Sequence, residues 1–150
     1  MKNLIIWLED QPIMISDECY FLESKGFEVK VISSATVLTN ILKNEYERIC
    51  LIILDIMLFS PKSFRSIGLD DISTDFGYNA GLAIAEFFLR EETSKYKDIP
   101  ILFVSMKPLN EEGQENLQKL NNSGAWVDYL QKGTYDSHKF DDIIRNYLNR

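Results

Sequence analysis

The sequence predicts a single α/β domain with a doubly wound, five-stranded parallel sheet and five helices. Three observations lead to this prediction. Five short apolar segments alternate strictly with five segments of helical period along the 150 residues. Parallel strands need crossover connections, which alternating helices provide. Several of the apolar segments are also continuously apolar, as expected for strands that helices cover on both faces.

The five strands are expected where the apolar runs occur. LIIWL, ICLIIL and IPILFVS are continuous runs, whereas FEVKVI alternates like a half-buried edge strand, and AWVDYL comes last. Each run is bounded by polar or turn-forming residues. The expected strands span residues 4–8, 27–32, 49–54, 99–105 and 125–130.

The five helices are expected between and after these strands. Pro12 suits a first helical turn, Gly26 suits a helix end, and Ser34 is expected to cap the second helix. In the last helix, Phe140 and Ile144 fall on one apolar face. The expected helices span residues 11–26, 34–44, 80–92, 110–124 and 136–150.

The composition limits the classes of function. The chain is 45% hydrophobic, which is ordinary for a globular protein, and its net charge is −7. An acidic chain without a Lys/Arg-rich run is not expected to bind nucleic acid or an anionic membrane surface. No signal peptide is recognisable, and the longest apolar run is too short to span a bilayer. We therefore expect a cytoplasmic protein.

Polar residues follow the predicted strands at the points where ligands bind in doubly wound sheets, outside the carboxyl ends of the strands. An acid at the end of the apolar run ICLIIL is the hardest of them to explain, because burying an unpaired charge costs several kcal/mol. All these side chains are expected to meet at one rim of the sheet. They are Glu9 and Asp10 after the first strand, Asp55 after the third, Ser105 at the end of the fourth, and Lys132 after the fifth.

The chemistry of this set is coherent. Three crowded carboxylates repel one another unless a cation neutralises them, and oxygen ligands with room for water suit Mg²⁺. An aspartate beside Mg²⁺ can attack a phosphoryl group, with Lys132 and Ser105 donating to the phosphoryl oxygens. Each residue also has an ordinary structural interpretation: the acidic pair could cap a helix, the serine could end a turn, and the lysine could be solvated.

In this arrangement the chain resembles the receiver domain of two-component response regulators over nearly its whole length. The segment GAWVDYLQKG, residues 124–133, is similar to the Gly-Ala-x-x-x-Tyr-x-x-Lys segment of that family. The resemblance implies a flavodoxin-like receiver fold with strand order 2-1-3-4-5. It also implies Mg²⁺-dependent phosphoryl transfer to Asp55 from a histidine kinase or a histidine phosphotransfer protein.

The resemblance also implies a role for each site residue. Lys132 and Ser105 would assist the transfer, and Ser105 and Tyr129 would form the switch that reports it. Such a domain is not an enzyme that acts on other molecules, since it catalyses only its own phosphorylation and dephosphorylation. The implied Mg²⁺ ligands are Asp10, Asp55, the main-chain carbonyl of Met57 and, through water, Glu9.

The chain departs from the family pattern at three positions around the site. Phe59 stands where the family usually has proline, and Met106 stands where it usually has a small residue. Met106 is expected to narrow the entry to the phosphorylation site. Gly133 replaces the proline that usually follows the lysine.

An insertion is the largest departure. In the family, a glycine usually lies a short distance after the acceptor aspartate, and here it corresponds to Gly81. About 18 extra residues, at about 59–79, therefore lie between the third strand and the third helix. The insertion carries Asp70, Asp71 and Asp75. It is either a solvated surface loop or a lid or docking element.

Two classes of function remain open from the sequence. The first is a stand-alone response regulator receiver, phosphorylated on Asp55, that signals through a partner protein. The alternative is a receiver-like protein–protein interaction module that is not phosphorylated. The intact set of Glu9, Asp10, Asp55 and Lys132 favours the receiver, whereas the altered residues around the site favour the module. A Mg²⁺-dependent phosphohydrolase would need a second acid where the chain has Met57. The sequence does not distinguish a monomer from a homodimer, and it does not identify the kinase or the effector.

Overall fold

The computed structural model describes residues 2–59 and 61–148. Its centre is one five-stranded sheet in which every neighbouring pair is parallel, in the order β2-β1-β3-β4-β5. The predicted fold class and strand order are therefore confirmed. The strands are β1 (Leu4–Leu8), β2 (Glu28–Ile32), β3 (Ile49–Leu54), β4 (Ile101–Ser105) and β5 (Val127–Gln131).

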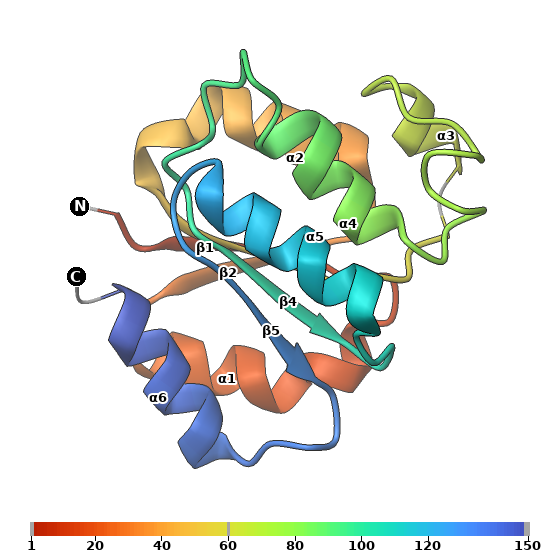
Figure 1. The fold of residues 1–150 in the computed structure, drawn as a ribbon. Coiled ribbons are helices and arrows are strands. Elements are labelled where there is room, and N and C mark those ends of the chain that lie inside the picture. Colours follow the sequence, from red (N-terminus) through yellow and green to blue (C-terminus); the bar gives the residue numbers. More distant parts are fainter. Residues whose placement is uncertain (1, 60, 149–150) are drawn as a thin grey trace.

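Helices cover both faces of the sheet (Figure 1). Helices α2, α4 and α5 pack on one face and α1 and α6 on the other. Short helical turns adjoin three of these helices. They are η1 (Pro12–Ile15) before α1, η2 (Tyr46–Arg48) after α2 and the π-helical turn η3 (Ala85–Leu89) after α4. The α-helices are α1 (Ser16–Ser24), α2 (Ala35–Glu45), α3 (Pro61–Arg65), α4 (Ala80–Ile84), α5 (Glu111–Asn122) and α6 (Ser137–Leu148).

The two covered faces explain the continuously apolar strands. Along β1, Leu4, Ile6 and Leu8 belong to the core on the side of α2, α4 and α5, whereas Ile5 and Trp7 belong to the core on the side of α1 and α6. All five side chains are buried. The edge strand β2 is only partly buried, as its alternating sequence predicts.

The helix prediction is correct except in two places. Among the described residues there is one α-helix more than predicted, α3, within the stretch expected to be an irregular insertion. Its first residue is Pro61, whose fixed φ suits the first turn of a helix. The helix expected over residues 80–92 ends earlier, at Leu89, after a π-helical turn. Ser60, which falls within the predicted insertion, and the terminal residues 1, 149 and 150 lie outside the described residues.

The stretch predicted to be an insertion lies at the end of the sheet where the site was predicted (Figure 1). The stretch that contains α3 projects beyond the carboxyl ends of the strands, on the side of α2 and α4 (Figure 1). None of the helices described in residues 2–59 and 61–148 is long and apolar enough to cross a membrane.

Candidate functional site

The carboxyl ends of the strands bring the predicted side chains together. Leu8 of β1 is level with Leu54 of β3, so Glu9 and Asp55 emerge side by side, and the Asp55 amide donates to the Leu8 carbonyl at 3.0 Å. On the other side, the Lys132 amide donates to the Ser105 carbonyl at 2.8 Å. The sheet itself therefore fixes the positions of these four residues.

Asp55 is 5% exposed, and donors surround its carboxylate. The Ser105 hydroxyl donates to Oδ1 at 2.6 Å, and the Met57 amide donates to the same oxygen at 3.2 Å. The Lys132 ammonium lies 3.1 Å from Oδ2. A charge at the end of an apolar strand is tolerated here because hydrogen bonds and an ion pair compensate its burial.

Glu9 is even more deeply buried, at 1% exposure. Its Oε2 lies 2.6 Å from the Lys132 ammonium, and its Oε1 accepts the Gln11 amide at 3.1 Å. Burial raises the pKa of Glu9 to about 7; the hydrogen bond to Lys132 opposes this shift and repulsion from Asp55 adds to it. Burial lowers the pKa of Lys132, but its bonds to Glu9 and the charge of Asp55 outweigh burial and leave that pKa above its ordinary value.

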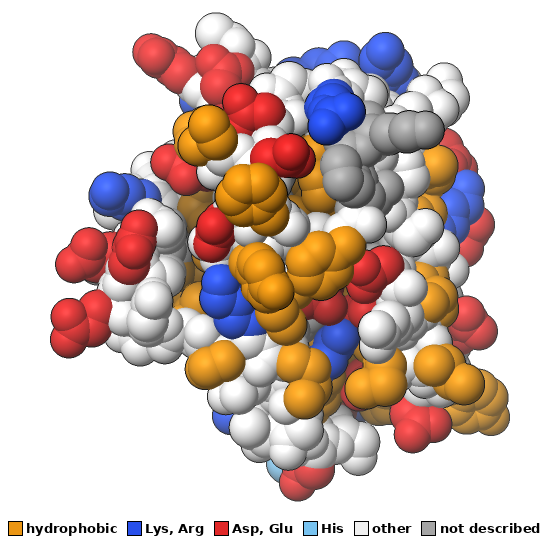
Figure 2. All heavy atoms as spheres, turned by 90° about the vertical axis from the view of Figure 1, so that its right-hand side faces the viewer, with side chains coloured by type: hydrophobic (Ala, Val, Ile, Leu, Met, Phe, Trp, Pro, Cys, Tyr) orange, Lys and Arg blue, Asp and Glu red, His pale blue; other side chains and the backbone are white. Residues whose placement is uncertain are grey.

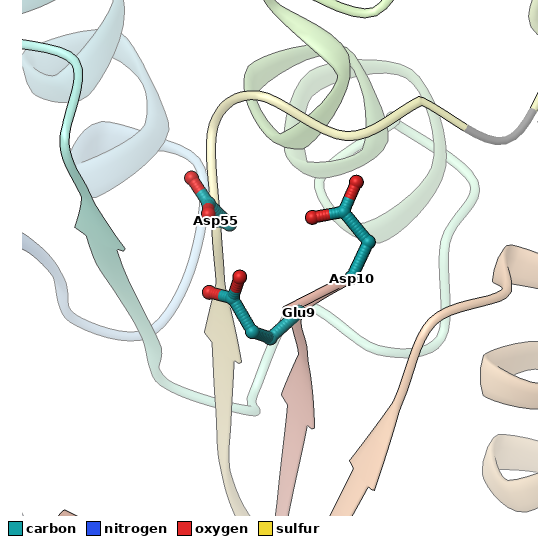
Figure 3. Close-up of side chains that lie close together, drawn as sticks. All are labelled: Glu9, Asp10 and Asp55. Atoms are coloured by element: carbon teal, nitrogen blue, oxygen red, sulfur yellow. The ribbon is translucent and has the colours of Figure 1, made fainter. Parts of the chain in front are cut away.

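The carboxylates of Glu9, Asp10 and Asp55 form a cluster that could hold a metal ion. One oxygen from each lies within 4.8 Å of the others, and Figure 3 shows the three groups around one space beyond the strand ends. Among the side chains that the structure describes, one ammonium, that of Lys132, pairs with two of these three acids, so the described cluster has an excess of negative charge. Carboxylate oxygens are hard donors, and a cluster of them with excess negative charge is suited to bind Mg²⁺. That the main-chain carbonyl of Met57 is a further Mg²⁺ ligand stays a prediction.

The proposed switch residues are connected through a residue that the sequence prediction did not include. Tyr129 on β5 is half-buried, and its hydroxyl donates to the Lys107 carbonyl rather than to Ser105. The Lys107 amide in turn donates to the Ser105 hydroxyl oxygen at 3.3 Å. Burial and the negative charge of Asp55 raise the pKa of the Tyr129 hydroxyl. Lys107 could have been suspected only from its place just after β4.

The insertion is bonded to the loop that follows Asp55. The Gly77 carbonyl accepts the Leu58 amide at 2.9 Å, and the Phe59 ring packs edge-on against Tyr78 with centroids 5.5 Å apart. The Phe59 amide also donates to Asp10 Oδ2 at 3.3 Å. The stretch predicted to be an insertion is thus bonded directly to the candidate metal site.

Apolar side chains gather around the site. Figure 2 looks onto the carboxyl edge of the sheet and shows hydrophobic side chains at the centre of that face, with acidic and basic groups beside them. Phe59 and Met106 are each more than half exposed in the loops at this edge. The narrowing of the entry by Met106 stays a prediction.

Sequence comparison gives no assignment. No family model matches the chain, and no curated protein sequence matches it.

Structural comparison, in contrast, finds many similar proteins. The chain is similar to the beryllofluoride-activated N-terminal receiver domain of RstA from Klebsiella pneumoniae, with a TM-score of 0.67 and 19% identity over 99% of this chain and 100% of that one. A response regulator receiver protein from Pseudomonas putida gives a TM-score of 0.68 and 19% identity, over 97% and 98% of the two chains.

A third similar structure contains a metal ion. It is the receiver domain of a sensor histidine kinase from Pseudomonas aeruginosa, with a magnesium ion coordinated in its active-site cleft; its TM-score is 0.62 at 19% identity, over all of both chains. At 19% identity, these similarities establish the fold of the chain. The chain has the fold of response regulator receiver domains over its whole length.

Proposed function

We propose that this chain is a receiver domain that accepts a phosphoryl group on Asp55 in a Mg²⁺-dependent reaction and signals through a partner protein. The donor is a histidine kinase or a histidine phosphotransfer protein. The observation that carries the proposal is the buried Asp55 carboxylate, which contacts both the Ser105 hydroxyl and the Lys132 ammonium beside two further acids. The magnesium ion in the similar Pseudomonas aeruginosa domain supports the choice of metal.

Asp55 is the nucleophile in this reaction. One of its carboxylate oxygens attacks phosphorus, and the bond between phosphorus and the donor imidazole nitrogen breaks. That nitrogen keeps the electron pair and takes up a proton from solvent, and Asp55 becomes an acyl phosphate. Attack of water on the same phosphorus later releases inorganic phosphate and restores the carboxylate. The chain thus acts only on its own phosphorylation state.

The neighbouring side chains prepare Asp55 for this role. Lys132 balances its charge before transfer and can pair with a phosphoryl oxygen afterwards, and the Ser105 hydroxyl can donate to another. Glu9, Asp10 and Asp55 would hold Mg²⁺, which when bound neutralises negative charge on the transferred group. No general base is needed, because the attacking group is already a carboxylate.

A small phosphodonor tests the proposal without knowledge of the kinase. The protein is incubated with acetyl phosphate and Mg²⁺, and its intact mass is measured. We expect one added phosphoryl group of about 80 Da, absent in Asp55→Asn and absent when a chelator removes the metal. The control Asp142→Asn, which removes an equal charge on α6, should be phosphorylated like the wild type.

Two results would contradict the proposal. An adduct that persists in Asp55→Asn would place the acceptor elsewhere. The absence of any adduct in the wild type, at saturating donor and Mg²⁺, would favour the interaction module that is not phosphorylated.

A further inference from the structure

Lys107 bonds to three separate parts of the molecule. Its amide donates to the Ser105 hydroxyl oxygen at 3.3 Å, and its carbonyl accepts the Tyr129 hydroxyl. Its ammonium donates to the Tyr78 carbonyl at 3.2 Å and to the side-chain oxygen of Asn79. One residue of the β4–α5 loop therefore contacts the acceptor site, β5 and the end of the insertion.

The end of the insertion is ordered by its own hydrogen bonds. The Phe76 amide donates to the Asp71 carbonyl at 2.7 Å, and the Asn79 amide donates to the Thr74 carbonyl at 2.9 Å. Protected amides of this kind report local opening in hydrogen exchange. The conformation of this segment can therefore be followed residue by residue.

The same segment holds an unfavourable backbone conformation. Asp75 and Phe76 are consecutive non-glycine residues with φ of 50° and 54°, in the left-handed region that side chains disfavour. Such a conformation persists only where surrounding contacts impose it. The contacts of Lys107 with Tyr78 and Asn79 lie two and three residues after Phe76.

We infer that Lys107 is a positioning residue that couples the state of Asp55 to the conformation of residues 70–79. The inference rests on the proposed function. The Ser105 hydroxyl has one proton, which it donates to Asp55 in this structure. A phosphoryl group on Asp55 gives that proton a new acceptor farther from the strand, so the hydroxyl oxygen must reorient relative to the Lys107 amide.

The loop then transmits this change because its contacts share one residue. The Lys107 amide, carbonyl and ammonium belong to one residue, so a displacement of its backbone shifts the point from which all three contacts are made. A shift at Ser105 therefore changes the bonds to Tyr78 and Asn79, which add contacts from the β4–α5 loop to a turn that also has its own hydrogen bonds. Residues 70–79 become an element whose order depends on phosphorylation.

Hydrogen exchange with and without Mg²⁺ and beryllofluoride, a phosphoryl stand-in, tests the inference. In the wild type, we expect amides 74–79 to change their exchange rates when the stand-in binds. In Lys107→Met these amides should already exchange at least about tenfold faster, because the two charge-assisted hydrogen bonds of the ammonium are lost, and they should no longer respond to the stand-in. Lys107→Arg, which keeps the donors, should restore the response, and Lys119→Met on α5 should behave like the wild type.

A second variant tests the coupling without any change in the β4–α5 loop. Asn79→Ala removes an acceptor from the insertion and leaves residues 105–107 unchanged, and it should weaken the response in the same segment. The amides of Ile56 and Met57, next to Asp55, report binding of the stand-in independently, since the Met57 amide donates to the Asp55 carboxylate. If they respond while residues 74–79 do not, or if Lys107→Met responds like the wild type, the coupling is wrong and the proposed function stands. If amides 56 and 57 do not respond in any variant, both fail.

Discussion

At Asp55, a buried charge is stabilised by groups that also have roles in the proposed reaction. Ser105, Lys132 and the Met57 amide supply the donors, so the carboxylate is held in one orientation before any ligand binds. Removing one partner of a buried ion pair generally costs several kcal/mol. The arrangement therefore constrains the fold as well as the site.

Glu9 makes the stability of the protein depend on pH. Its pKa of about 7 lies above the ordinary 4.5, so between these values the folded state binds more protons than the unfolded state. The free energy of unfolding should therefore fall as pH rises from 5 to 8, by up to about 3 kcal/mol from this group. Urea unfolding in the presence of a chelator measures this effect.

The variant Glu9→Gln should lack this part of the pH dependence, because its amide does not titrate. Glu115→Gln, at an exposed position of α5, is the matched control and should retain it. Parallel stability curves for Glu9→Gln and the wild type would show that Glu9 does not titrate in this range.

At the scale of elements, the regular strands were predictable and the loops around the site were not. Leu4–Leu8 and Ile49–Leu54 are apolar on both faces, so their sequences alone indicate central strands. The contacts of Lys107 depend on where the insertion folds, which no local pattern encodes. The π-helical turn before Arg90 was also not predicted. It is followed by a side chain that bonds to the carbonyls of Tyr96, Ile99 and Ala125, and these contacts arise only in the folded chain.

The close contact between α4 and β3 depends on Gly81. A Cβ at this position would lie 2.0 Å from the Asp55 carbonyl oxygen and 2.9 Å from the Ile56 Cα, and neither backbone atom can move freely. Gly81→Ala should therefore destabilise the protein by about 3 kcal/mol or more and reduce phosphorylation, because it displaces the backbone of Asp55. Thermal or urea unfolding measures the loss of stability.

Gly113→Ala is the control for this prediction. This glycine lies in α5, and its nearest contact would be the flexible side chain of Leu109 at 2.9 Å. The change should cost less than about 1 kcal/mol, since alanine also favours the helix. Equal losses in the two variants would mean that α4 can move away from β3 without penalty.

At the scale of the whole molecule, the sequence predicted where the polar side chains of the candidate site converge, because the carboxyl ends of parallel strands share one edge. It placed Glu9, Asp55, Ser105 and Lys132 at four strand ends, and the structure brings these side chains into contact. It did not show that the insertion bonds to the same site. That contact joins residues from separate loops and follows only from the assembled fold.

The identity of the phosphorylated residue is the most direct test of the whole account. After reaction with acetyl phosphate and Mg²⁺, the protein is reduced with borohydride, which converts an aspartyl phosphate to homoserine, and its peptides are sequenced by tandem mass spectrometry. We predict homoserine at position 55 and unchanged aspartate at position 10 and at positions 70, 71 and 75. Homoserine at one of those other positions, with Asp55 unchanged, would contradict the assignment of Asp55 as the phosphoacceptor.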